Sequence, residues 1–258
     1  MVGFKPTQGR CPDLGRYSVP YGQQAISSQV GVLARQVEDV EPALRAINAS
    51  GDPAQDGSFA LPASEGVRVG GLACMRRTPP SLLRLRCNGR LQRARSCCVA
   101  LVWKWSSGRP PDPRRAEALL FGIFTSGARH YKELLAGDPR DPRVAQLITL
   151  SNLSHRIAGF LGSLLRALGQ RSLGRGLALF GRRSTEAYWQ LAEAVQDYRR
   201  DFRQALENGP GGRLDAFLSP ATGLPAVPHG ASTELGVIGA YTLLQSVGRA
   251  ASVAARFM

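Results

Sequence analysis

The pattern of apolar residues predicts an α/β protein. Two short runs, 67–70 and 214–218, are typical of strands, and stretches with an apolar residue every third or fourth position lie around them. Strands that alternate with helices favour an α/β architecture. The 258 residues are 43% hydrophobic, which is enough to bury a sizeable core in one large domain or two small ones.

The first predicted helix covers 37–47. Its apolar residues are spaced three, four and three apart, which puts them on one face: Val37, Val40, Leu44 and Ile47. Glu38, Asp39 and Glu41 lie at its start, where the helix dipole favours negative charge, and Pro42 is tolerated only in a first turn. The polar stretch 48–56, with its Gly and Pro residues, predicts a surface loop before the strand at 67–70.

The window 71–111 shows neither helical nor strand periodicity and contains four of the five cysteines. From 66 to 111 there are ten Lys or Arg and no acid, so this stretch supplies +10 of the net charge of +14. One alternative function is therefore a cationic protein that binds RNA or an anionic membrane surface through 66–111. Only Trp103 and Trp105 offer rings for stacking near it, so a nucleic-acid partner is the weaker prediction.

An ordinary globular pattern resumes at Ala116, with an apolar run to 124 and a helix-like stretch through Leu134 and Leu135. Asp141-Pro142 marks a turn or the entry to a new helix. Beyond it a second helical stripe begins, whose apolar residues are separated by four, three or one positions. Its members are Leu153, Ile157, Phe160, Leu161, Leu164, Leu165 and Leu168, and a short apolar stretch from Leu177 to Phe180 follows.

Six arginines and no acid lie between Leu153 and Arg183. A basic, leucine-rich helix pair of this kind can lie on an anionic membrane, cover a partner or pack on its own domain, and the pattern leaves all three open.

The clearest helix is predicted over 184–206. Ser184 is its N-cap, its apolar residues repeat at three and four, and Arg199 belongs to the face predicted to contact water. The sequence NGPGG from Asn208 ends it. A short buried strand at 214–218, a long irregular loop and a further apolar helix over 234–244 complete the chain.

No site for chemistry emerges from composition and spacing. The sequence lacks a G-x-S-x-G elbow, a phosphate loop and H-E-x-x-H, so no catalytic residue, cofactor site or metal site is predicted. The histidines His130, His155 and His229 are scattered, and Ser27-Ser28 fits a loop or cap. The cysteines are predicted to be free thiols.

Several stretches, in order, resemble the amidase signature family, and most closely its fatty-acid amide hydrolase branch. The sequence GFKPTQGR at 3–10 is similar to the turn that follows the family's Gly/Ser-rich signature, and 21–47 is similar to the segment whose G-P-x-A-R-x-V-E-D pattern opens a helix. Here Val32 stands where proline is usual. The stretches at 122–147, 182–202 and 214–230, and GAYTLLQS at 239–246, resemble the later half of the family in register.

The resemblance implies the C-terminal part of the amidase signature fold, a mixed central sheet flanked by helices, and therefore an incomplete domain. The family hydrolyses carboxamides with a nucleophilic serine, a second serine and a lysine, all of which would lie before Gly3. No residue of this chain matches them. We therefore expect a chain that is inactive alone, whose partners are a small-molecule amide in the intact family and a missing N-terminal half carried by a separate chain.

The resemblance also divides the chain. We expect a post-signature segment at 1–70, an atypical, frame-shifted or disordered segment at 71–111, a cap with a C-terminal strand and helix region at 112–245, and an aberrant tail at 246–258. In fatty-acid amide hydrolases an apolar helix pair at this place meets the membrane and opens to the acyl-chain channel, so the apolar residues between Leu153 and Phe180 are the candidate site. The implied location is cytoplasmic, with peripheral membrane association.

Overall fold

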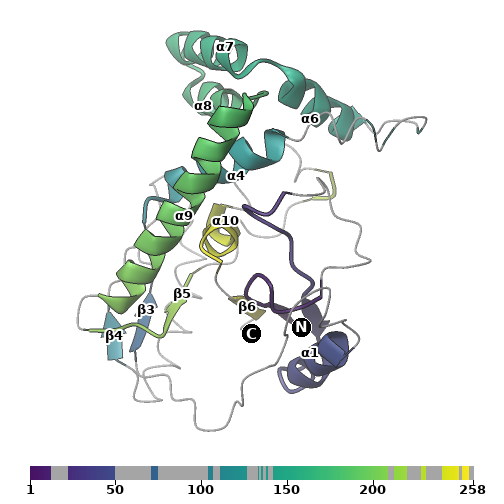
Figure 1. Cartoon of the computed structure of the whole chain (residues 1–258), viewed down its shortest axis with the longest axis vertical. Coiled ribbons are helices and arrows are strands. Elements are labelled where there is room, and N and C mark those ends of the chain that lie inside the picture. Colours follow the sequence, from purple (N-terminus) through teal and green to yellow (C-terminus); the bar gives the residue numbers. More distant parts are fainter. Residues whose placement is uncertain are drawn as a thin grey trace. The chain divides into compact units, whose positions relative to one another are not determined.

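The computed structural model describes residues 1–12, 23–49, 71–74, 104–106, 111–126, 133, 135, 138, 142–208, 212–219, 228–230, 240–249 and 252–255. The chain divides into two compact units. Unit 1 comprises Met1–Arg16, Ser27–Pro113 and Tyr198–Met258, and unit 2 comprises Tyr17–Ile26 and Arg114–Asp197. Figure 1 labels the helices and strands along the chain.

The first sheet of unit 1 is antiparallel, with β1 (Val2–Lys5) between β2 (Val32–Ala34) and β6 (Ser252–Ala255). Side chains alternate across a strand, so Val32 turns inward, where it is 9% exposed, and Leu33 turns outward. Helix α1 (Val40–Ala49) adds Leu44 to a small core that contains Val32 and Cys11. Strand β6 falls within the segment that we expected to be an aberrant tail.

Helix α1 confirms the helix predicted near residue 40, but its start is later than the apolar spacing indicated. Val37 lies in the turn before it, where Val40 N donates to Val37 O at 3.1 Å, and is 60% exposed. The inclusion of Val37 in the predicted helix was therefore wrong. Pro42 occupies the first turn, as its missing N–H requires.

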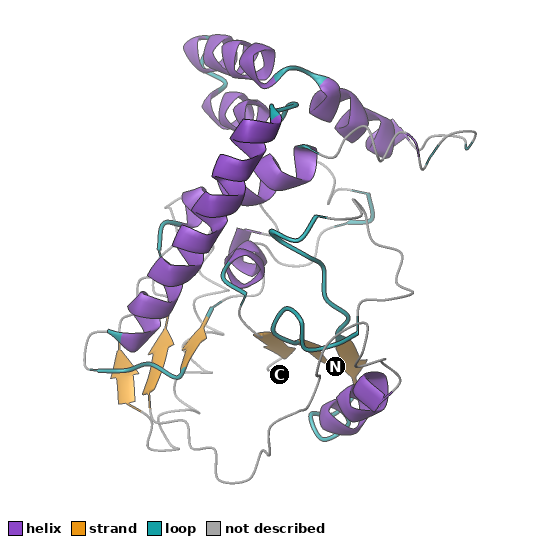
Figure 2. Ribbon diagram, viewed as in Figure 1, coloured by secondary structure: helices purple, strands orange, loops and turns teal. Residues whose placement is uncertain are grey.

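The second sheet is parallel, with β3 (Gly71–Cys74) between β4 (Lys104–Ser106) and β5 (Ala216–Leu218). Figure 2 shows the three short arrows side by side. The strand at β5 was predicted, whereas β3 and β4 lie in the window 71–111, where the sequence shows no strand periodicity. Three or four residues are too few for alternation to show in the sequence. The strand expected at 67–70 lies outside the described residues.

Helix α9 (Thr185–Glu207) confirms the clearest predicted helix, and Ser184 caps it, because Ala187 N donates to Ser184 Oγ at 3.2 Å. In unit 1 its residues Tyr198 and Phe202 are buried, as are Leu244 and Val247 of α10 (Ala240–Val247). The Tyr198 hydroxyl donates to Pro111 O at 3.2 Å. The start of the helix expected over 234–244 lies outside the described residues.

Arg199 corrects the predicted polar face of α9. It is 5% exposed, and its guanidinium donates to Val247 O at 3.0 Å and to Gln8 Oε1 at 3.1 Å. Burial and the nearby charge of Arg249 lower its pKa to about 10. The residue thus connects α9 to the end of α10 and to the turn after β1.

Unit 2 is helical, with α4 (Pro113–Thr125), α6 (Pro142–Asn152), α7 (His155–Ala167) and α8 (Arg171–Leu179). Helix α6 begins at the proline predicted as a helix entry. Ala116 and Ile123 of α4, Ala158 of α7 and Val195 of α9 are fully buried.

Candidate functional site

Helices α7 and α8 form a hairpin, residues 155–179, in which small residues allow the backbones to meet. A Cβ built on Gly162 of α7 would lie 2.5 Å from Gly174 O of α8, and 3.1 Å from the Ala178 Cβ. Ala158 and Gly162 of α7 and Gly174 of α8 are buried. The contact between the helices is therefore made by small side chains and backbone. The large apolar side chains are not needed for it.

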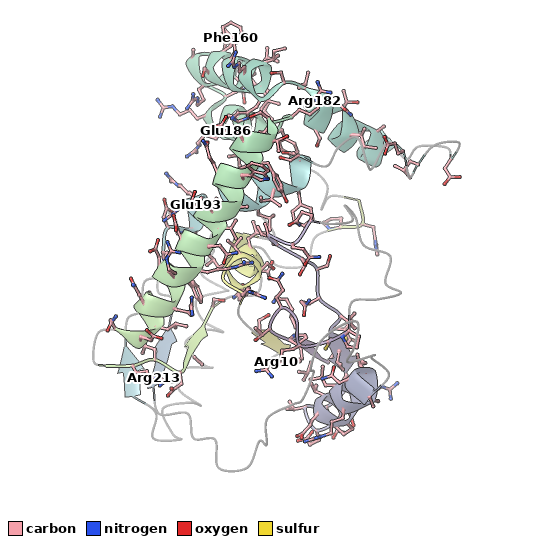
Figure 3. All side chains as sticks on the ribbon, viewed as in Figure 1. Arg10, Phe160, Arg182, Glu186, Glu193 and Arg213 are labelled. Atoms are coloured by element: carbon pink, nitrogen blue, oxygen red, sulfur yellow. The ribbon has the colours of Figure 1, made fainter. Side chains whose placement is uncertain are left out.

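Those large side chains lie on the outside of the hairpin. Phe160 is 70% exposed, and Figure 3 shows it projecting from the side of α7 opposite α8. Of the nine apolar residues predicted as the site, five are exposed and four are half-buried. The exposed five are Ile157, Phe160, Leu161, Leu164 and Leu168, and the half-buried four are Leu153, Leu165, Leu177 and Phe180.

We call the exposed five residues, with Leu173 of α8, the hairpin surface. Leu173 is 61% exposed and was missed in the sequence, although it lies between the two predicted apolar stretches. Trp189 on α9, which is 68% exposed, was also missed in the sequence. The signal that could have separated outer from inner residues is the spacing of Ala158 and Gly162, which marks the face of α7 that meets another helix.

The base of the hairpin is closed by a pair of backbone hydrogen bonds. His155 N donates to Arg182 O at 3.1 Å, and Arg182 N donates to Leu153 O at 2.7 Å. Gly181 makes this closure possible, because its φ is +111° and a Cβ there would lie 2.7 Å from the His155 Cα. The Nδ1 atom of His155 lies 3.1 Å from Phe180 O. This contact is typical of a histidine with a structural role.

Arg183 fastens the end of the hairpin to α4. Its Nη1 donates to Gly122 O at 3.3 Å and to Gly181 O at 3.4 Å, and its Nη2 donates to Leu179 O at 3.3 Å. These carbonyls belong to the last turns of α4 and α8 or follow them, where helices lack internal partners and carry partial negative charge. Burial lowers the pKa of Arg183. Beside it, the rings of Phe121 and Phe180 lie 5.5 Å apart between centroids.

The charge around the hairpin surface is positive. Arg156, Arg166, Arg171, Arg175 and Arg182 are all exposed. The nearby carboxyl of Glu117 is half-buried, and desolvation raises its pKa, while the charges of Arg175 and Arg114 oppose that rise. The hairpin and the residues just after it thus combine exposed apolar side chains with exposed arginines.

The described residues bring together no cluster of His, Cys, Asp or Glu suited to a metal ion. Ser27 and Ser28 lie in a loop, with no helix or strand assigned there, and His229 is exposed; His130 lies outside the described part of the chain. Cys11 is a buried free thiol whose pKa is raised by desolvation. These observations leave the hairpin surface as the candidate site.

Comparison with known proteins decides the family. The Amidase family model matches residues 1–257, nearly the whole chain. The chain belongs to the Amidase family. Among curated relatives it is similar to fatty-acid amide hydrolase 1 of Sus scrofa, with 27% identity over 256 residues, which cover 95% of this chain and 42% of that protein.

Solved structures share the fold of this amidase-family chain. An amidase crystal structure matches with a TM-score of 0.68 and 18% identity over 100% of this chain and 51% of the other. A fatty acid amide hydrolase structure matches with a TM-score of 0.66 and 19% identity over 98% of this chain and 40% of the other. The chain therefore spans about half the length, or less, of the proteins it matches. Within the described residues, no helix is long and apolar enough to cross a membrane.

Proposed function

We propose that this amidase-family chain supplies the cap of a carboxamide hydrolase and that its hairpin surface binds an anionic membrane. The observation that carries the proposal is the combination of six exposed large apolar side chains and four exposed arginines on one hairpin, with the exposed Arg182 just after it. Fully burying a leucine or phenylalanine side chain is worth about 1.5–3 kcal/mol. Each Lys or Arg near an anionic lipid surface adds about 1 kcal/mol.

Fatty-acid amide substrates fit this proposal, because long acyl chains partition into membranes. The residues Leu165, Leu177 and Phe180 are half-buried, and the ring of Phe180 lies beside that of Phe121 on α4. They are the candidates for contact with an acyl chain. As part of the same proposal, the hydrolytic step itself is assigned to a nucleophilic serine, a second serine and a lysine of the intact domain.

Vesicle sedimentation with the full chain tests the membrane role. We expect binding to vesicles of phosphatidylcholine and phosphatidylserine, weaker binding to phosphatidylcholine alone, and loss of binding in the variant Phe160→Ser/Leu164→Ser/Leu168→Ser. These side chains are 70%, 48% and 70% exposed, so the triple variant should keep its fold. A matched control is Trp189→Ser on α9, outside the hairpin. Equal binding of the triple variant and the wild type would contradict the proposal.

Hydrolysis is tested separately. Removing a nucleophile that acts together with its base typically costs a factor of about 10⁴ to 10⁶ in turnover. We therefore expect no release of fatty acid from an acyl amide by the purified chain alone. Turnover that disappears when one of its own serines is changed would show that the nucleophile lies within this sequence.

A second candidate function remains the binding of RNA or anionic lipid through 66–111, supported by its ten basic residues and absence of acids. Most of that window lies outside the described residues. Binding through it should weaken steeply with salt, as phosphate contacts do, and should vanish when 75–103 is deleted. Retention of RNA binding by the deletion variant would exclude this window as the binding element.

A further inference from the structure

Three of the four arginines of the hairpin lie at the turn that joins α7 to α8. We call Arg166, Arg171 and Arg175 the turn arginines. All three are exposed, and residues 155–179 contain no Asp or Glu. The fourth arginine, Arg156, lies ten residues before Arg166 on α7, which is about 15 Å along the helix axis.

Side-chain contacts bring the turn arginines together across the two helices. Gly174 of α8 leaves room for the stem of Arg166, since a Cβ built on this glycine would lie 2.8 Å from Arg166 Cγ. Arg175 turns back toward the start of α8, because its Nε donates to Arg171 O at 3.3 Å. Arg171 and Arg175 therefore precede and follow the point at which Arg166 reaches α8.

The N–H donors of these arginines are only partly used within the described part of the chain. Arg166 Nη2 donates to Ser163 Oγ at 2.9 Å. The charge of Arg175 acts on the half-buried carboxyl of Glu117 on α4 and opposes the rise in its pKa. For the Arg171 guanidinium, the described residues supply neither a hydrogen bond nor an ion pair. A guanidinium has several N–H donors, so most of those at this turn are available to an outside acceptor.

The turn arginines also repel one another. Like charges raise the energy of a site in which they are close together, and the hairpin itself contributes no carboxylate to offset them. An anion bound among the three guanidinium groups would relieve this repulsion. The surface is therefore suited to an anion with more than one charge.

The donors and the neighbouring leucines indicate the class of anion. A phosphomonoester carries about −1.5 to −2 charges near pH 7 and three acceptor oxygens, and arginine binds phosphate through paired hydrogen bonds. The phosphodiester of phosphatidylserine offers fewer free oxygens, and its ammonium group is repelled by the arginines. Leu168 and Leu173 at the same turn are 70% and 61% exposed, which suits the acyl chains of a lipid better than a free ion.

We propose that the turn arginines bind the phosphomonoester headgroup of an anionic lipid of the phosphatidic acid type. The proposal rests on the membrane role proposed above and names the headgroup that the hairpin prefers. Bidentate contacts from the three guanidinium groups hold the phosphate, while the exposed leucines beside them enter the acyl layer.

Vesicle sedimentation with the full chain tests this preference. One set of vesicles contains phosphatidylcholine with phosphatidic acid, and the other contains phosphatidylcholine with phosphatidylserine at the same surface charge, matched by zeta potential. We expect the Kd for the phosphatidic acid vesicles to be about tenfold lower, as one additional charge-assisted hydrogen bond supplies. The variant Arg166→Lys/Arg171→Lys/Arg175→Lys keeps the charges but not the paired donors, so it should lose the preference and still bind both kinds of vesicle.

Arg156→Lys is the matched control and should keep the preference, because it makes the same exchange outside the turn. Equal binding of the wild type to the charge-matched vesicles would overturn the headgroup assignment and leave the membrane role standing. A triple variant that retains the preference would have the same meaning, and absence of binding to either vesicle would overturn both proposals.

Inorganic phosphate distinguishes a lipid headgroup from the free ion. Without vesicles, we expect no saturable binding of micromolar phosphate to the full chain in isothermal titration calorimetry. We also expect millimolar phosphate to leave the preference for phosphatidic acid vesicles in place, because the free ion lacks the contribution of the acyl chains. Saturation at micromolar phosphate would show a site for the free ion and would overturn the assignment to a lipid.

Discussion

Replacing Arg183 by methionine should loosen the attachment of the hairpin to α4. The change removes a guanidinium whose Nη atoms lie 3.3 Å from Gly122 O, 3.4 Å from Gly181 O and 3.3 Å from Leu179 O. Hydrogen bonds from a charged donor contribute about 1.5–3 kcal/mol each, and the long distances here put each at or below the lower end of that range. Loss of a cation at two helix C-termini adds about 0.3–1 kcal/mol per helix.

The half-buried guanidinium also has a desolvation cost, which the methionine variant lacks, so part of the lost stability is offset. We therefore expect Arg183→Met to lower the free energy of unfolding by about 2–3 kcal/mol, and Arg183→Lys to lower it less, since lysine keeps the charge but not the fork. Urea unfolding followed by circular dichroism measures both.

Arg182→Met is the matched control, because this neighbour is exposed and contributes to the closure through its backbone alone. Its variant should stay within about 0.5 kcal/mol of the wild type, as exposed substitutions usually do. Equal free energies of unfolding for the Arg182 and Arg183 variants would refute the claim that the Arg183 side chain holds the hairpin against α4.

Gly162→Val should destabilise the chain by about 1–3 kcal/mol in thermal unfolding, because its Cβ would meet Gly174 O, whereas Gly159→Ala on the same helix meets nothing within 4 Å and should gain about 0.5–1 kcal/mol. Arg249 has a φ of +60°, so Arg249→Gly should gain about 0.5–1 kcal/mol, and more than Arg249→Ala, which removes the same charge but keeps the strained backbone. Glu117 has a raised pKa in the folded state, so its contribution to stability is present at low pH and is lost as pH rises through that pKa. Glu117→Gln should therefore be more stable than the wild type at pH 7 and equal to it near pH 3; a constant difference across this range would contradict the assigned cause.

Local signals in the sequence were sufficient for several of the helix boundaries. Ser184 and the glycines after Asn208 bound α9, and Pro142 marks the start of α6, since caps and breakers act through neighbouring residues. The helical stripe over 153–168 likewise predicted α7. The strand at 214–218 was recognisable because an apolar run there is closed by Pro220.

The tertiary contacts could not be predicted from these local signals. Arg199 lies among charged neighbours on α9, and no pattern indicates that Val247 O and Gln8 accept its hydrogen bonds from distant parts of the chain. Strand β3 is stabilised by pairing with β4 on one side and β5 on the other, which periodicity within three or four residues cannot reveal.

The sequence predicted that the apolar residues of the candidate site lie along a helix, but it did not predict which way they face. The spacing of Ile157, Phe160 and Leu164 shows one helical face without saying what covers it. The answer lies in the small residues Ala158 and Gly162, which face α8 and leave the larger ones outside. A leucine-rich helical stripe next to a row of small residues therefore predicts a hairpin whose large apolar side chains lie on its outer surface.

The most direct test of the proposed membrane role is photocrosslinking from the hairpin surface. Benzoylphenylalanine is placed at position 160, or at the exposed position 193 of α9 as control, and the full chain is irradiated with vesicles containing phosphatidylserine. We expect lipid adducts from position 160 and few from position 193. Equal labelling from both positions, or none from position 160, would contradict the proposed membrane role.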